Sequence, residues 1–241
     1  MKKKNFLLCF LVFFITACSS GYRAALKDRI IKKNSFSEGI EWSHTWMVST
    51  NKHDLPRVLI IGDSHVEGYY QGVAEKLGNK VYCCKFTTSR SLGDPALIEQ
   101  LKALFFSYRF DVICFNNGLH GVAYTDEQYN HYLPVVYRLF KKENPGLKLI
   151  WVNTTARRVG NNLSEFDKYN VAVINRNKAV EEFARLKNIP LIDYYSISVN
   201  HPDYYKNDGI HFNITGVEEE ANLVATEILK VLENTKKALK Q

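Results

Sequence analysis

The sequence lacks the motifs that usually bind nucleotides, nucleic acids or transition metals. It contains no GxGxxG or GxxxxGK(S/T) string to hold phosphates, and no HExxH or CxxC spacing to hold zinc. Its lysines and arginines form no block interleaved with aromatic residues, which would be typical of a nucleic-acid groove. We therefore expect a site built from ordinary side chains, and no nucleic acid as a partner.

Cysteine is also scarce beyond the N-terminal region. The chain has five cysteines, and Cys83, Cys84 and Cys114 are the three that lie within apolar runs of the later sequence. Two of them are adjacent, which is not the spacing of a disulfide framework or of zinc ligands. We expect all three to be buried strand residues.

The N-terminus has the pattern of an export signal. Lysines precede an apolar run over residues 6–15 that is too short to span a bilayer, and small residues follow it. The segment ITAC at 15–18 resembles a bacterial lipobox, which implies cleavage after residue 17 and attachment of lipid to Cys18. The alternative is an ordinary secretory signal, residues 1–17, with a chance cysteine behind it.

A lipid on Cys18 would hold the protein stably on a membrane of the bacterial cell envelope, outside the cytoplasm. Removal of the three signal lysines lowers the formal charge from +7 to +4. Residues 18–54 then form a tether and a leader segment. Because EWSHTWM at 41–47 is richer in aromatic residues than a free linker, we expect the leader to pack on the domain that follows.

Residues 55–241 show no internal repeat and no change of composition, so we expect one domain. Short apolar runs alternate there with segments of helical period, and four of the runs are almost wholly apolar, as in strands covered on both faces. This alternation predicts an α/β fold, a three-layer α/β/α sandwich around a parallel sheet. The expected strands are 58–61, 81–84, 112–115, 149–152 and 191–192, and the expected helices are about 66–77, 95–106, 126–143, 166–187 and one after Thr215.

Two helix starts carry a capping box, Thr125 with Gln128 and Thr215 with Glu218. Polar residues follow the apolar runs, at the carboxyl ends where open parallel sheets have their sites. They are Ser64 after the first run, Ser91 and Gly93 after the second, Asn116 at the end of the third, and Asn153 to Arg158 after the fourth.

Asp208 and His211 stand three residues apart, just before the last helix. A serine hydroxyl is a weak nucleophile and needs an imidazole whose Nε2 faces it and whose Nδ1–H is held. Asp208, in a tight turn, can accept a hydrogen bond from Nδ1 of His211, which leaves Nε2 for Ser64. The three residues are therefore the parts of an acyl-transfer site.

Attack on an acyl carbon also creates an oxyanion, which needs preorganised hydrogen-bond donors. The candidates are the side-chain amide of Asn116, the backbone N–H of Ser64, and a backbone N–H at Ser91 or Gly93.

These segments resemble the SGNH hydrolase superfamily, also called GDSL esterases and lipases. The segment IIGDSHVEG matches the nucleophile block and NDGIHFN the acid and base block, which implies Ser64 as nucleophile, Asp208 as acid and His211 as base. The segment CFNNGLHG matches the oxyanion block, with Asn116 at the asparagine and Cys114 where the family usually has glycine.

The family's glycine block is matched least well, because Ser91 stands at its position and the nearest glycine is Gly93. The resemblance extends from about residue 55 to 231. It implies a flavodoxin-like sheet of five parallel strands and hydrolysis of an ester through an acyl-enzyme, without a metal or organic cofactor. The GDSHVEG segment is not a GxSxG elbow, since Val66 occupies the second glycine position, and this disfavours the α/β-hydrolase fold.

The export signal, the tether and the lack of an obvious apolar lid together predict an O-acetyl esterase that acts on an extracellular acylated glycan. A lipase, lysophospholipase or thioesterase of the same superfamily is an open alternative, as is an inactive glycan-binding lipoprotein. Four loop residues at the predicted catalytic edge could contact the substrate, such as an acidic sugar, or could simply be surface residues. They are His120, Arg90, Arg157 and Arg158.

Overall fold

The computed structural model describes residues 35–238. The predicted signal, the predicted lipid attachment at Cys18 and the tether as far as residue 34 lie outside the described residues. A compact unit begins at Phe36. Among residues 35–238, no helix is both long enough and apolar enough to cross a bilayer.

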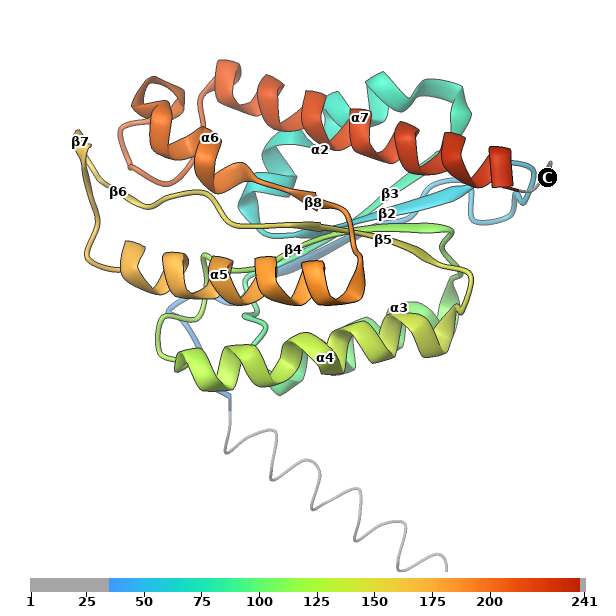
Figure 1. The fold of residues 1–241 in the computed structure, drawn as a ribbon, viewed down its shortest axis with the longest axis horizontal. Helices are drawn as coiled ribbons and strands as arrows, with labels where there is room; N and C mark the ends of the chain where they lie inside the picture. Colours follow the sequence, from blue (N-terminus) through green and yellow to red (C-terminus); the bar gives the residue numbers. More distant parts are fainter. Residues whose placement is uncertain (1–34, 239–241) are drawn as a thin grey trace, which may run out of the picture. The chain divides into compact units, whose positions relative to one another are not determined.

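A six-stranded sheet forms the centre of this unit, in the order β1-β3-β2-β4-β5-β8 (Figure 1). Its strands are β1 (Ser43–Trp46), β2 (Arg57–Gly62), β3 (Tyr82–Thr88), β4 (Val112–Asn116), β5 (Lys148–Val152) and β8 (Leu191–Ile192). All neighbours pair in parallel except β1, which is antiparallel to β3. The five parallel strands and their flavodoxin-like order confirm the prediction, and β1 is an addition to it.

Helices cover both faces of the sheet (Figure 1). One face carries α2 (Ser64–Leu77) and α7 (Ile214–Ala238), and the other carries α3 (Pro95–Ser107), α4 (Asp126–Glu143) and α5 (Asn170–Lys187). Along β2, Val58 and Ile60 pack toward α2 and α7, while Leu59 and Ile61 pack toward the opposite layer. Burial on both faces explains why this strand is apolar throughout. The predicted three-layer sandwich is confirmed.

The leader segment contributes strand β1 to the sheet. Ser43 is paired with Thr88 of β3, and Trp46 with Lys85. Just before β1, the backbone N–H of Trp42 donates to Ser89 Oγ at 2.9 Å. The leader therefore packs on the domain as expected, and it does so as an edge strand beside the carboxyl end of β3.

A small hairpin delays the start of α5. The strands β6 (Arg158–Val159) and β7 (Asn162–Phe166) pair antiparallel ahead of it, so the helix begins at Asn170 and not at residue 166 as predicted. The short helix α6 (Tyr194–Asn200) and the 3-10 turns η1 (Gly78–Lys80) and η2 (Pro202–Tyr204) complete the elements. Cys83, Cys84 and Cys114 are buried and free, as expected.

The two predicted capping boxes have different outcomes. Thr125 and Gln128 form the box at the start of α4. The prediction of a capping box at Thr215 is wrong. Asn213 caps α7 instead, because its Oδ1 accepts the N–H of Thr215 at 3.0 Å. Glu218 pairs instead with Lys76 of α2 at 2.7 Å.

Candidate active site

Ser64 lies at the junction between β2 and α2. Strand β2 ends at Gly62, Asp63 caps the helix by accepting the N–H of His65 at 3.0 Å, and Ser64 is the first helical residue. A Cβ at Gly62 would lie 2.4 Å from Cγ2 of Val66, so this tight turn excludes larger residues. The turn presents Ser64 at the carboxyl end of β2, the edge where open parallel sheets have their sites.

The side chains of Ser64, His211 and Asp208 form a continuous chain of hydrogen bonds. Ser64 Oγ lies 2.9 Å from His211 Nε2, and His211 Nδ1 lies 2.8 Å from Asp208 Oδ2. When Nδ1–H donates to the carboxylate, Nε2 carries the lone pair that accepts the Ser64 hydroxyl proton. The first distance allows the Ser64 proton to pass to His211 Nε2, and the second is a hydrogen bond that holds the imidazole ring while Asp208 stays ionised. The structure thus brings together the three residues predicted as nucleophile, base and acid.

Asp208 also holds the turn that carries His211. Its Oδ1 accepts the backbone N–H of Ile210 at 2.9 Å and of His211 at 2.8 Å. Although partial burial opposes ionisation, these N–H groups and the His211 ring lower the pKa of Asp208 below its usual value. Asp208 is therefore a carboxylate at neutral pH, the form that can accept all three hydrogen bonds.

Gly209 lets this turn approach the start of β6. It has φ of +73°, and a Cβ there would lie 2.3 Å from the carbonyl oxygen of Arg158. The backbone N–H of Arg158 donates to Gly209 O at 2.8 Å. Both the positive φ and the close approach require glycine.

The backbone oxyanion candidates belong to two segments. The N–H of Ser64 is at the first position of α2, where an α-helix offers no internal acceptor. Within residues 35–238, the N–H of Ser91 makes no hydrogen bond, whereas the N–H of Gly93 donates to Ser91 Oγ at 3.3 Å. Of the two alternatives for the third donor, this arrangement favours Ser91.

Asn116 lies at the end of β4 with its amide turned toward β5. Its Nδ2 is 2.9 Å from the carbonyl oxygen of Asn153 and 3.2 Å from that of Val152. To donate to an oxyanion, the amide must keep one N–H free of these carbonyls or turn away from them. The role of Asn116 stays a prediction.

Asn117, which was not among the predicted site residues, holds the loop that contains Ser91. Its Oδ1 accepts the N–H of Leu92 at 2.7 Å, and its Nδ2 donates to Arg90 O at 2.9 Å. The side chain is buried, and the bond to Leu92 is shielded from water, while the bond to Arg90 is partly buried. Its position directly after Asn116, at the end of a strand, is the one signal the sequence offers.

Arg158 does not face an open site, which corrects its predicted contact with substrate. It is 4% exposed, and its guanidinium donates to the carbonyl groups of Leu163, Ser198 and Val199 at distances between 2.6 and 3.0 Å. A buried guanidinium needs such acceptors to replace water. Arg158 therefore joins the β6–β7 hairpin to α6.

Arg90 and Arg157 are partly exposed, and each has a carboxylate nearby. Arg90 lies 2.8 Å from Asp94 and 3.4 Å from Glu41, and Arg157 lies 3.7 Å from Asp167. These acids offset the positive charge that a substrate carboxylate would need. Contact of either arginine with substrate stays a prediction.

His120 connects the loop after β4 to the leader segment. Its Nδ1 lies 2.8 Å from Glu38 Oε2, while Glu38 Oε1 accepts the N–H of Gly121 at 2.7 Å. Burial opposes the charged ring, but the hydrogen bond to Glu38 and the negative charges of Glu38, Asp63 and Glu41 together outweigh it and raise the pKa of His120. The ring also lies edge-to-face with Trp42, with centroids 6.1 Å apart.

Arg176 of α5 holds the loop after β4 through hydrogen bonds to its backbone. Its guanidinium donates to the carbonyl groups of Gly118, His120 and Gly121 at 2.8 to 2.9 Å. The side chain is 1% exposed, so these carbonyls take the place of solvent. Sequence gave no sign of this role, because a single arginine within a helix normally lies at the surface.

Within the described part of the chain, no three His, Cys, Asp or Glu side chains lie together as metal ligands would.

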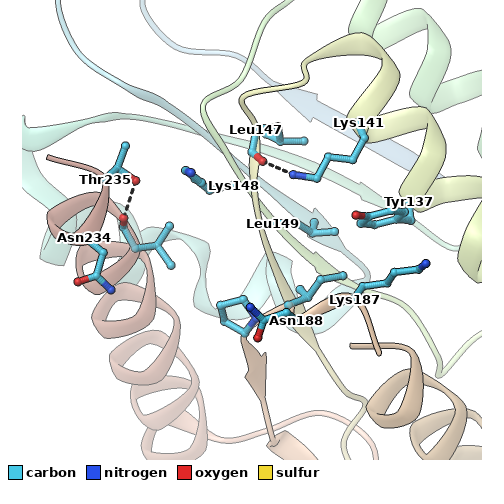
Figure 2. Close-up of a pocket in the computed structure, with 12 residues that line it drawn as sticks. Tyr137, Lys141, Leu147, Lys148, Leu149, Lys187, Asn188, Asn234 and Thr235 are labelled. Atoms are coloured by element: carbon cyan, nitrogen blue, oxygen red, sulfur yellow. Dashed lines mark hydrogen bonds between the residues drawn. The ribbon is translucent and has the colours of Figure 1, made fainter. Parts of the chain in front are cut away.

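A pocket of about 420 Å³ lies where β5 begins, and its lining includes Lys141, Lys148 and Lys187 (Figure 2). Lys141 Nζ donates there to Leu147 O at 2.6 Å. The pocket is at the amino end of β5, whereas Ser64 follows the carboxyl end of β2. Because these strands run in parallel, the pocket and the triad lie at opposite ends of the strands.

Comparison with known proteins identifies the fold. No protein-family profile and no curated protein sequence matches the chain. Among solved structures, a GDSL-like lipase from Bacteroides thetaiotaomicron matches with a TM-score of 0.59 and 17% identity, covering 73% of this chain and 89% of that chain. An acetyl xylan esterase matches with a TM-score of 0.59 and 17% identity, covering 71% and 99%. A carbohydrate esterase family 3 structure from Talaromyces cellulolyticus matches with a TM-score of 0.58 and 14% identity, covering 75% and 99%.

Proposed function

We propose, from the premise that this chain has the fold of the SGNH hydrolases, that it is a serine esterase whose nucleophile is Ser64. The observation that carries the proposal is the hydrogen-bonded chain from Ser64 through His211 to Asp208. It ends at a carboxylate whose lowered pKa keeps it charged at neutral pH. Such a chain activates a serine hydroxyl for attack on an acyl carbon.

The reaction follows from these positions. Ser64 Oγ forms a bond to the ester carbonyl carbon while its proton passes to His211 Nε2, and the carbonyl oxygen becomes an oxyanion. Backbone N–H groups at Ser64 and Ser91 stabilise that oxyanion, with Asn116 as a further candidate. His211 then gives its proton to the leaving alcohol oxygen as the ester bond breaks. Water, deprotonated by His211, then attacks the acyl carbon. The bond from that carbon to Ser64 Oγ breaks, His211 returns the proton to Oγ, and the acid leaves.

The substrate class that we propose is an O-acetylated extracellular carbohydrate. Two of the solved structures with this fold bear the names acetyl xylan esterase and carbohydrate esterase. The export pattern supports an extracellular substrate. Trp42, which is partly exposed beside the carboxyl end of β3, supplies an aromatic surface against which a sugar ring can pack. Anchoring through Cys18 would hold the enzyme at the cell envelope, and a Cys18→Ser variant that stays membrane-bound after export would contradict it.

A lipase or related long-chain esterase is the second candidate, because a GDSL-like lipase has the same fold. Initial rates on nitrophenyl esters of increasing chain length separate the two. The acetyl ester should be cleaved fastest, and an optimum at octanoyl or longer chains would replace the deacetylase proposal with the lipase one.

A fluorophosphonate probe tests the serine chemistry itself. The wild-type domain should be labelled, and Ser64→Ala should abolish labelling while the fold, monitored by circular dichroism, is kept. A folded wild-type protein that is not labelled would instead support an inactive glycan-binding protein.

A further inference from the structure

His65, the residue after the nucleophile, is buried beneath the triad. Its Nδ1 lies 2.8 Å from Oε1 of Glu220 on α7, and its Nε2 lies 3.0 Å from the carbonyl oxygen of Ile210. Thr155 Oγ1 is a weaker neighbour of Nε2, at 3.3 Å. The side chains of His65 and Glu220 are only 5% and 3% exposed, so no water competes for these bonds.

The contacts determine where His65 carries its protons. A carbonyl oxygen can only accept, so Nε2 must be protonated in order to bond to Ile210. The second proton is shared between Nδ1 and the Glu220 carboxylate, and the bond between them exists with the proton on either side. Burial opposes a charged ring, but the charge and hydrogen bond of Glu220 outweigh it and raise the pKa of His65 to about 9. Burial raises the pKa of Glu220 as well, so the pair keeps the shared proton at neutral pH.

The acceptor of the Nε2–H belongs to the turn that carries the catalytic acid and base. Ile210 stands between Asp208 and His211, so its carbonyl group moves whenever that turn moves. The His65 ring also lies nearly parallel to the His211 ring, with centroids 6.2 Å apart and planes inclined by 24°. One buried side chain thus joins the residue after the nucleophile to the residue before the base.

We infer that His65, held by Glu220, is a positioning residue that fixes the Asp208–His211 turn relative to Ser64. This inference rests on the proposed esterase function. The Nε2–H bond to Ile210 sets the height of the turn above α2, and thereby the 2.9 Å separation of Ser64 Oγ from His211 Nε2. Without that bond the turn keeps its own internal hydrogen bonds, but it loses its fixed distance from the nucleophile.

Two substitutions at this position separate positioning from stability. In His65→Gln the amide nitrogen takes the place of Nε2 and still reaches Ile210, but the contact with Glu220 is lost. In His65→Asn the shorter amide takes the place of Nδ1, keeps Glu220 and does not reach Ile210. Tyr194→Phe is the control, because it removes a buried hydrogen bond to the backbone of Glu220 without touching the turn.

The measurements are kcat and KM for nitrophenyl acetate, together with the melting temperature. We expect kcat of His65→Gln to stay within about threefold of wild type and kcat of His65→Asn to fall about 10- to 100-fold with KM little changed, the usual cost of a small misplacement of reacting groups. Tyr194→Phe should melt earlier with an unchanged kcat. If kcat follows the melting temperature across the three variants, His65 is structural only and the inference fails.

A second measurement does not depend on the variants folding. NMR of wild-type protein labelled at its histidine nitrogens should show a proton on Nε2 of His65, and an unprotonated Nε2 would overturn the inference. Failure of the proposed function is separate, because in that case wild-type protein itself neither hydrolyses the ester nor reacts with the fluorophosphonate.

Discussion

Asp208→Asn tests the central geometry, because it exchanges one atom of the triad and leaves the turn intact. The asparagine Oδ1 can still accept the two backbone N–H groups that Asp208 accepts at 2.8 and 2.9 Å. Its NH2 group, however, would face Nδ1 of His211, which must then become an acceptor. That tautomer places the proton on Nε2, where it faces Ser64 and cannot accept the hydroxyl proton.

The expected loss has two parts. In the productive tautomer, Nδ1–H of His211 no longer has the charged acceptor that it has in wild type, a loss of about 2 kcal/mol. Loss of the carboxylate removes its attraction for the imidazolium, about 4 kcal/mol at 4 Å and an effective dielectric of about 20. Because Asp208 and His211 have 46% and 43% of their side-chain surface exposed, solvent reduces this to about 2 kcal/mol. The sum of about 4 kcal/mol predicts a fall in kcat of about 10³-fold.

The assay is steady-state hydrolysis of nitrophenyl acetate near pH 8, with the melting temperature measured in parallel. Asp203→Asn is the matched control, because Asp203 lies 3.4 Å from His201 on the surface and outside the triad, and its kcat should not change. A kcat for Asp208→Asn within tenfold of wild type would refute the assignment of Asp208 as the residue that sets the His211 tautomer.

Three further changes follow from the same geometry. Gly209→Ala should lower both the melting temperature and kcat, because it places a side chain at φ of +73° and a Cβ 2.3 Å from Arg158 O. Gly39→Ala is the control and should lower neither, because a Cβ there would have no neighbouring atom within 4 Å. Equal effects of the two substitutions would contradict this prediction. Asn117→Ala should lower the free energy of unfolding in urea by about 1 to 3 kcal/mol, and kcat with it, since the Ser91 loop loses one buried and one partly buried hydrogen bond. Unchanged values would count against that loop as an oxyanion element. The folded state raises the pKa of His65 from 6.5 to about 9, so it binds the extra proton more tightly than the unfolded chain. That stabilisation is complete below pH 6.5 and is lost as the pH rises to about 9, and His65→Gln should flatten the dependence of the urea-derived unfolding free energy on pH over this window.

The central strands could be predicted from their composition, because strands that are buried on both faces are apolar at nearly every position. Val58 to Ile61 are apolar at every position, which a strand covered by helices on both sides requires. β1 could not be predicted in the same way. All four of its residues are exposed, and its pairing partners are about 40 residues away, so neither composition nor local spacing reveals it.

The triad could be predicted because Ser64, Asp208 and His211 lie in short motifs whose spacing has a chemical reason. The contacts around the triad could not be predicted from short motifs, because they join residues that are far apart in the sequence. His65 meets Glu220 across 155 positions, and no local pattern pairs them. Arg158 has the sequence context of an exposed loop arginine, and its burial depends on carbonyl groups that the fold brings together.

Strand β1 has a consequence for which shortened forms of the protein can stay in solution. It covers the outer edge of β3 from Lys85 to Thr88. A form that begins at residue 55 would contain every triad residue, yet it would present this edge with unpaired N–H and C=O groups. Such an edge is a template for strands of other molecules, so the shortened form should aggregate although its catalytic machinery is complete. β1 itself is only four residues long, a poor template for further growth.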